Sequence, residues 1–217
     1  EVRELAEAQD DERKAAVDMR LIDPELPEEP GGKIERMADK AAAFYKDGEK
    51  HKFAQLLFVN QGPPGSDALY PVYTDLIGKL VARGIPREEI ATIYDAKKDE
   101  DKQALFDRVN KGEIRVLIGS MLKMGTGVNV QERAKVLQQL EPCFTPGLLV
   151  QMEGRVLRQG NINWEDPTKP QEVTMVRYLS KGSSDEFMYS LLAAKHKVNQ
   201  DFLSGRLEAD VIVDVDI

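Results

Sequence analysis

The sequence predicts an α/β fold with an open parallel sheet flanked by helices on both faces. Short apolar runs that suit buried strands alternate along the chain with longer segments of helical periodicity. Strands that are separated by helices pair in parallel through right-handed crossovers. No unit of 20 to 50 residues repeats, so a solenoid or a propeller is not indicated.

The elements follow one another in a regular order. The first helix of the sheet domain is predicted over 33–50, because Ile34, Met37, Ala38, Ala41 and Tyr45 share one face. Strands are predicted at 55–60, 90–94, 115–119, 134–140 and 172–179, with helices at 70–83, 99–111, from Thr145 onward, and at 183–203. The alternating VIVDVDI at 211–217 is a further edge-strand candidate.

Composition divides the chain into a preface, a domain and a tail. A helical segment runs to Arg20, and residues 21–32 are rich in Pro, Gly and Glu, as linkers are. We therefore predict an N-terminal helix and linker over 1–32, a domain over 33–205, and a tail or edge strand over 206–217. The first residue is Glu1 in a charged, helix-like stretch, so we expect the chain to begin within a longer protein.

Composition also limits the class of protein. Of the 217 residues, 41% are hydrophobic and 31% are charged, and no run approaches the roughly 20 apolar residues of a membrane span. A single cysteine, Cys143, excludes an internal disulfide and a cysteine-rich zinc site, and it fits a reducing cytoplasm. His51 and His196 lie far apart in the sequence, so no metal site is predicted. We expect no membrane partner and a cytoplasmic location.

Net charge bears on whether the partner is a nucleic acid. The formal charge is −8, which opposes phosphate binding by the chain as a whole. The acidic excess lies in residues 1–54 and 162–217, however, and residues 55–161 are nearly neutral. A local basic groove in the centre therefore remains compatible with the composition.

A glycine-containing strand exit is the first candidate for ligand chemistry. The segment 116–131 leads from a strand into a loop with Gly119, Gly125 and Gly127, at the sheet edge where open α/β folds bind ligands. Glycines there allow backbone N–H groups to face a phosphate or a ribose. Ordinary turn chemistry gives the same pattern, so this loop alone leaves both interpretations open.

A helix with two arginines on one face is the more specific candidate. Thr145 suits an N-cap and Pro146 suits the first helical position. At about 100° per residue, Gln151, Arg155 and Arg158 fall on one side. Leu149, Met152 and Val156 gather on roughly the opposite side. A solvated face would explain two arginines, but Gly154 beside them costs about 1 kcal/mol of helix propensity and suggests close approach of another group.

These segments resemble known motifs. QMEGRVLRQGN (151–161) looks like motif VI of superfamily 2 helicases, and GSMLKMGTGVNVQ (119–131) looks like motif V. The stretch from Lys33 to Gly205 is similar to the second, C-terminal RecA-like lobe of these enzymes. It is closest to the chromatin-remodeller-like translocases of large bacterial and phage proteins that join such a helicase to an adenine-specific DNA methylase.

The resemblance implies roles for particular residues. Arg155 and Arg158 would be arginine fingers that reach the γ-phosphate of ATP across an interlobe cleft, and Gln151 would help to seat them. The positions that it implies near the nucleotide and the DNA backbone are Gly125, Gly127 and Asn129, with Ser120 and Lys123 as phosphate contacts. ATP and Mg²⁺ are the implied cofactors, and the partners are DNA, a first RecA-like lobe of the same polypeptide and a linked methylase domain.

The chain departs from the family pattern in two places. Relatives usually carry a threonine where this chain has Met121, whose side chain cannot donate a hydrogen bond, so one DNA contact is in doubt. The family's His-His-Leu-Asp stretch with a following Pro-Trp is replaced by residues 138–143, which end in Cys143. We expect Cys143 to be a small buried side chain rather than a reactive thiol.

Some motifs of a complete motor do not occur in the sequence. No GxxxxGK[ST] phosphate loop is present, because GGK at 31–33 lacks the following hydroxyl residue, and DDER at 10–13 lies on a helix-like segment. We therefore expect this chain alone to be inactive as an ATPase. We interpret Trp164 as a loop-packing residue rather than a platform for base stacking.

Two other functions remain as alternatives. One is a RecA-like module that binds nucleic acid or protein without catalysis. The presence of both Arg155 and Arg158 argues against this alternative. The other is an adenine methylase, suggested by NQGPPGSDALYP (60–71), but Gln61 and Gly62 separate the asparagine from the two prolines. Pro63, Pro64 and Gly65 are accordingly expected to form a turn.

Overall fold

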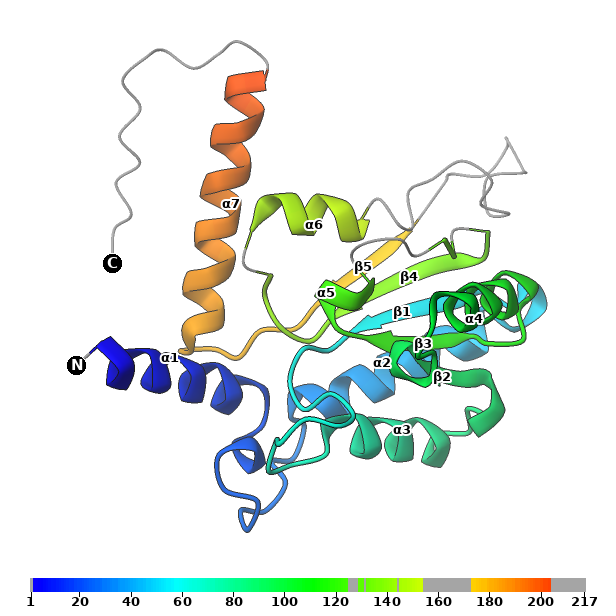
Figure 1. Cartoon of the computed structure of the whole chain (residues 1–217), viewed down its shortest axis with the longest axis horizontal. Coiled ribbons are helices and arrows are strands. Elements are labelled where there is room, and N and C mark those ends of the chain that lie inside the picture. Colours follow the sequence, from blue (N-terminus) through cyan, green and yellow to red (C-terminus); the bar gives the residue numbers. More distant parts are fainter. Residues whose placement is uncertain (1, 125–128, 131, 144, 154–172, 204–217) are drawn as a thin grey trace.

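A five-stranded parallel sheet forms the centre of the molecule. The computed structural model describes residues 2–124, 129–130, 132–143, 145–153 and 173–203. The strands are β1 (Ala54–Phe58), β2 (Ile90–Thr92), β3 (Val116–Gly119), β4 (Ala134–Gln139) and β5 (Thr174–Arg177). They are arranged in the order β2-β3-β1-β4-β5, and every pair is parallel (Figure 1). The predicted fold class is confirmed.

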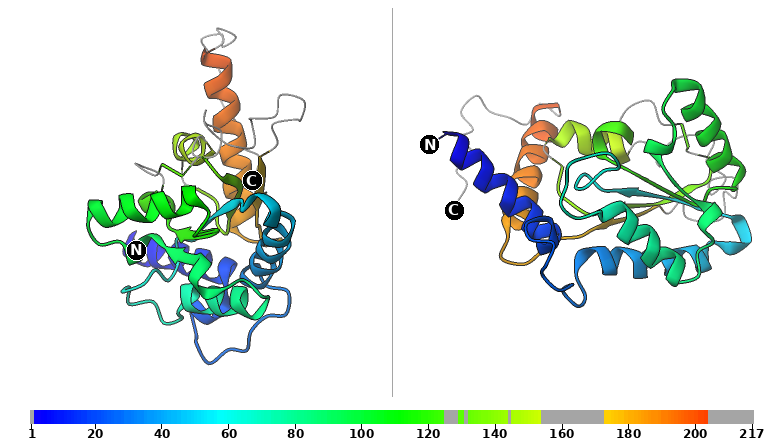
Figure 2. Two further views of the ribbon diagram at one scale, coloured as in Figure 1. Left: turned by 90° about the vertical axis from the view of Figure 1, so that its right-hand side faces the viewer. Right: turned by 60° about the horizontal axis from the view of Figure 1, so that its bottom comes forward.

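Helices cover both faces of this sheet (Figures 1 and 2). One face is covered by α2 (Lys33–Asp47) and α3 (Val72–Ala82). The other is covered by α4 (Asp99–Lys111), α5 (Met121–Met124), α6 (Pro146–Glu153) and part of α7 (Ser184–Leu203). In the described part of the chain, no helix is long and apolar enough to cross a membrane.

The strands have a side-chain pattern that requires this three-layer arrangement. Leu56 and Phe58 of β1 belong to the core on the α4 side, whereas Leu57 and Val59 belong to the core on the α2 side, and all four are fully buried. Successive side chains of a strand point to opposite faces, so a continuous apolar run needs cover on both sides. The second face of β1 would otherwise be exposed to water.

Helix α2 follows its predicted face closely. Ile34, Met37, Ala38 and Ala41 are buried against β1 and β3, and Tyr45 is half-buried with its hydroxyl donating to Glu89 at 2.9 Å. The helix ends at Asp47 rather than continuing to residue 50. A 3₁₀ turn over Glu49–His51 takes its place.

The second strand is shorter than predicted. The sequence IATIY suggests a strand over 90–94, but β2 ends at Thr92 and a 3₁₀ turn covers Ile93–Asp95. The Thr92 backbone N–H donates to the Asp95 carboxylate at 2.7 Å. This local bond is part of a capping box between Thr92 and Asp95 at the start of the 3₁₀ turn.

The N-terminal segment packs at the carboxyl ends of the strands. Helix α1 (Val2–Val17) lies beside the beginning of α7 (Figure 1), and the Ser180 hydroxyl donates to the Ala16 carbonyl at 2.8 Å. After α1, the Arg20 guanidinium pairs with Asp18 and lies 4.1 Å from the centroid of the Tyr70 ring. The division at residue 32 stays a prediction, and residues 206–217 lie outside the described residues.

The segment that suggested a methylase forms a turn, as predicted. The Ser66 backbone N–H donates to the Pro63 carbonyl at 3.0 Å. Gly65 has a φ of 81°, in the left-handed region that glycine adopts without strain.

Two glycines provide a matched test of the packing. A Cβ at Gly119 would lie 2.6 Å from Ile93 Cγ2 and 2.7 Å from Met124 Cγ, whereas a Cβ at Gly78 in α3 would meet nothing within 4 Å. We expect Gly119→Ala to lower the free energy of unfolding by roughly 1–3 kcal/mol through overpacking. Gly78→Ala should raise it by about 0.5–1 kcal/mol through helix propensity. Urea unfolding of both variants checks this, and equal stabilities would contradict the packing.

Candidate functional site at the carboxyl ends of the strands

Polar residues follow three neighbouring strands where each of them ends. Asn60 comes after β1, Ser120 directly follows β3, and Glu141 comes after β4. Because these strands are parallel and adjacent, their exits meet at one edge of the sheet. Open α/β sheets bind their ligands at this edge.

Hydrogen bonds connect the three exits. The Glu141 Oε1 atom accepts from the backbone N–H groups of Asn60 at 2.9 Å and Gln61 at 3.1 Å. The Asn60 Oδ1 atom in turn accepts from the Met121 backbone N–H at 2.9 Å. A carboxylate on one strand exit therefore fixes the second exit, and that exit fixes the third. Neither Asn60 nor Glu141 is predicted as a site residue from the sequence, although a polar residue soon after an apolar strand is a usable signal.

Burial sets the electrostatics of this edge. Burial raises the pKa of the Glu141 carboxyl, while the hydrogen bonds from Asn60 and Gln61 and the nearby charge of Lys33 act against that rise. Lys33 and Asp185 form a buried ion pair, and burial lowers the pKa of the Lys33 ammonium. A pocket of about 150 Å³ separates Glu141 and Asp185 from α1. The carboxylates here are engaged within the protein.

The two predicted phosphate contacts differ in their accessibility. The Ser120 hydroxyl is nearly buried, accepts from the Lys123 backbone N–H at 3.3 Å and lies 3.0 Å from the Tyr94 hydroxyl. Lys123 is exposed on α5. The ammonium of Lys123 is therefore accessible to a ligand, whereas the Ser120 hydroxyl already has partners.

Met121 belongs to the core. Its side chain is 2% exposed and packs in the cluster on the α4 side of the sheet. The resemblance implies a polar threonine at this position. The methionine of this chain contributes to core packing instead. Cys143 is 1% exposed, which confirms that it is a small buried side chain.

Helix α6 begins as the sequence predicts. The Thr145 hydroxyl accepts from the Leu148 backbone N–H at 3.3 Å, and the Thr145 carbonyl accepts from Leu149 N at 3.2 Å. Gln151 is exposed and Met152 is fully buried, in agreement with the predicted faces. Arg155 and Arg158 lie outside the described residues, as do Gly154, Val156 and Trp164.

The two motif-like segments approach each other at their described ends. Helices α5 and α6 are in contact, and Met124 and Met152 belong to the same core cluster. Gly125 and Gly127 lie outside the described residues. Asn129 lies elsewhere, because its carbonyl accepts at 2.9 Å from the Asn110 side chain at the end of α4. Ser120 and Lys123 thus lie at the short helix α5 that contacts α6, whereas Asn129 is near the amino ends of the strands.

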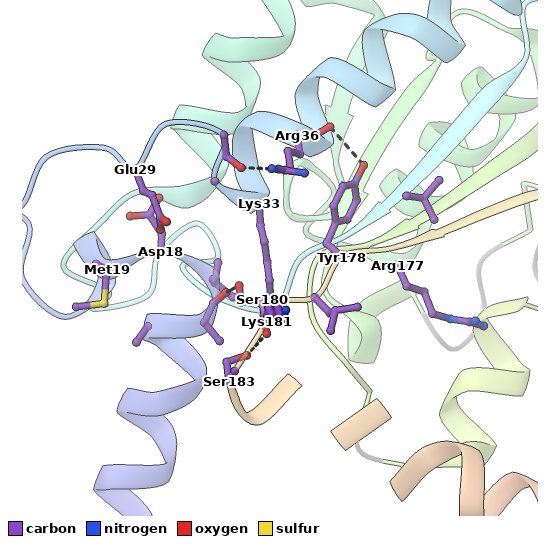
Figure 3. Close-up of a pocket in the computed structure, with 18 of the residues that line it drawn as sticks. Asp18, Met19, Glu29, Lys33, Arg36, Arg177, Tyr178, Ser180, Lys181 and Ser183 are labelled. Carbon is purple, nitrogen blue, oxygen red and sulfur yellow. Dashed lines mark hydrogen bonds between the residues drawn. The ribbon is translucent and has the colours of Figure 1, made fainter. Parts of the chain in front are cut away.

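A further polar contact links β5 to α6. The Arg177 Nε atom donates to Gln139 Oε1 at 3.0 Å, and Gln139 Nε2 lies 3.9 Å from Met152 Sδ. In Figure 3, Arg177 extends away from Lys33 and Tyr178. Arg177 is not predicted as a site residue from the sequence.

A large groove lies behind this edge, between the N-terminal segment, α2 and the end of β5 (Figure 3). Its volume is about 1230 Å³, and its walls include Met19, Arg36 and Lys181. The Tyr178 hydroxyl points toward the Arg36 carbonyl at 3.5 Å. The groove therefore separates the N-terminal segment from the sheet domain along part of their contact.

The described residues do not supply a metal site by themselves. Among them, no group of three or more His, Cys, Asp or Glu side chains could hold an ion. Glu141 accepts from two backbone N–H groups, and Asp185 pairs with Lys33.

A comparison with family models finds one match. Residues 71–160 match the helicase conserved C-terminal domain. The matched span is less than half of the chain. It includes strands β2, β3 and β4, helices α5 and α6, and the positions of Arg155 and Arg158. It supports the resemblance at the level of a helicase C-terminal domain. A comparison with curated proteins gives no match.

Solved structures support the same fold. The C-terminal part of the Fun30 ATPase domain is 17% identical with a TM-score of 0.55, and the match covers 81% of this chain and 55% of that one. The DUF1998 helicase MrfA bound to DNA is 11% identical with a TM-score of 0.51, covering 74% of this chain and 20% of that one. The chain spans about half or less of these proteins, and at such identities the likeness establishes the fold alone.

Glu141 gives a test of the buried edge. Because its pKa is raised above the ordinary 4.5, the stability contributed by the protonated carboxyl is lost as the pH rises through the folded-state pKa. Glu141→Gln keeps an oxygen acceptor without the charge. We expect the variant to gain stability relative to the wild type as the pH rises above the ordinary carboxyl pKa of 4.5 and through the raised pKa of Glu141.

Urea unfolding at several pH values measures this difference. The exposed Glu132→Gln is the matched control and should show no such trend. A difference between Glu141→Gln and the wild type that does not change with pH would mean that burial does not affect the carboxyl.

Proposed function

We propose that this chain is the second RecA-like lobe of an ATP-dependent DNA helicase or translocase of superfamily 2. It would supply residues to an ATP site shared with a first lobe of the same polypeptide. The observation that supports this most directly is the match to the helicase C-terminal domain, because it spans both motif-like segments. The contact between α5 and α6 also favours it, since both segments need to reach one site.

The arginines provide the proposed chemistry. Arg155 and Arg158 follow the buried Met152 by three and six residues in the sequence. Guanidinium groups that face a transferring phosphoryl group stabilise the negative charge that develops on its oxygens, which is worth about 10³ to 10⁵ in rate. Gln151 is exposed at the end of the described helix and is available to hold a neighbouring arginine.

The strand exits provide the proposed contacts with DNA and nucleotide. Lys123 is exposed on α5, which contacts α6, and it would contact a backbone phosphate, with Ser120 shaping the loop through its hydrogen bonds. Gly125 and Gly127 would allow the backbone to approach the ligand closely. Asn129 is not assigned to this contact, because its carbonyl accepts from the Asn110 side chain at the end of α4, near the amino ends of the strands.

The first lobe would hold ATP and Mg²⁺. The sequence has no phosphate loop, and the described residues offer no metal site, so the triphosphate needs donors from elsewhere. This chain by itself would then turn over no ATP. A linked methylase domain and a cytoplasmic location stay predictions.

Kinetics of an arginine variant test the function in the polypeptide that carries both lobes. We expect Arg155→Lys to lower the DNA-stimulated rate of ATP hydrolysis by about 10³-fold or more, equivalent to about 4 kcal/mol, with a much smaller change in KM for ATP. Lysine keeps the charge but lacks the planar fork that spans two phosphate oxygens.

The matched control is Arg83→Lys at the end of α3, where the arginine pairs with Asp39 on the other face of the sheet. Its rate should stay within about threefold of the wild type. If Arg155→Lys behaves as this control does, the segment is a solvated helix face and the chain is better described as a non-catalytic binding module.

A further inference from the structure

The amino ends of the three central strands carry a group of basic side chains. Strands β3, β1 and β4 begin side by side at the end of the sheet opposite the predicted site (Figure 1). The loops that enter these strands bring five cations together. This amino-edge cluster consists of Lys50, Lys52, Lys111, Arg133 and Lys135.

Specific contacts hold the three loops against one another. The Arg133 guanidinium donates to the Asn110 carbonyl at 2.7 Å and to the His51 carbonyl at 2.6 Å, so it joins all three loops. A Cβ at Gly112 would lie 3.0 Å from the Lys52 Cβ and 3.3 Å from the Arg133 Cδ, which leaves room only for glycine.

An aromatic ring supports the remaining cation. The Lys135 ammonium lies 4.5 Å from the centroid of the Phe53 ring, and His51 stacks on the same ring with a centroid distance of 5.1 Å. The loops of the cluster are therefore positioned before any partner binds. Binding of a partner would therefore cost little conformational entropy for ordering these loops.

The charges of this edge are not balanced. Residues 46–53, 108–115 and 132–135 contain eight Lys and Arg against four Asp and Glu, although the chain as a whole carries −8. Two of the four carboxylates are already engaged, Glu49 with Arg115 and Glu113 with Arg108. Within the described part of the chain, none of the five cations of the cluster has a carboxylate in ion-pair distance.

We propose that the amino-edge cluster binds the phosphate backbone of duplex DNA, on a surface separate from the proposed contacts of Ser120 and Lys123. Exposed lysines and an arginine held by backbone carbonyls suit a contact that follows phosphates without reading bases. The two surfaces lie at opposite ends of the sheet, so they would contact different stretches of DNA. The choice of DNA over an acidic protein rests on the proposed function.

Salt-dependent binding of the 217-residue chain tests this surface. Fluorescence anisotropy with a labelled 30-base-pair duplex, between 50 and 200 mM KCl, compares the wild type with Lys50→Gln/Lys111→Gln. Each lost phosphate contact lowers the slope of log K against log salt by about 0.9, so we expect a decrease of about 1.8 and roughly tenfold weaker binding at 100 mM KCl.

The matched control is Lys40→Gln/Lys181→Gln, which removes two exposed lysines from the walls of the groove beside α2 and should leave the slope unchanged. Three results would overturn the proposal: an unchanged slope in the amino-edge variant, no duplex binding by the wild type at 50 mM KCl, or a loss seen with polyglutamate and not with the duplex. No ATP is used, so failure of this test and failure of the ATPase test are separate.

Discussion

Glu141 is a buried carboxylate, and the carboxyl edge of the sheet depends on its two hydrogen bonds to the backbone of Asn60 and Gln61. Without that acceptor, two half-buried N–H groups would lose this partner, and the full cost for a buried group is about 1–3 kcal/mol. Asn60 would also lose the support that lets it hold the Met121 backbone. The loop that leads to Lys123 and the helix that leads to Arg155 both begin from this connected edge.

The two ends of the sheet differ in how their charges are compensated. At the carboxyl end, the charges of Lys33 and Asp185 are buried and paired with each other. At the amino end, Arg133 is held by carbonyl groups, which leave its charge uncompensated. Hydrogen bonds hold loops at both ends, but among the described residues the group of five basic side chains lies at the amino end. This contrast could not be deduced from a net charge of −8.

Much of the fold could be predicted because the strands are apolar on both faces, as in the run QLLFV. Helix α6 was predictable from Thr145 and Pro146, since capping is a local property. The end of β2 was not predicted, because it coincides with a hydrogen bond that the Asp95 carboxylate accepts from the Thr92 backbone N–H. Glu141 was missed as a site residue because its partners are about 80 positions away. Local patterns do not encode such long-range pairs.

The central claim is that this chain completes an ATP site formed with another lobe. A structure of the two-lobed polypeptide with DNA, Mg²⁺ and ADP-beryllium fluoride tests it most directly, because the fluoride mimics the γ-phosphate. The account predicts guanidinium nitrogens of Arg155 and Arg158 within about 3 Å of the fluoride or its neighbouring oxygens. A closed complex in which both arginines face solvent, with the nucleotide fully held by the first lobe, would contradict it.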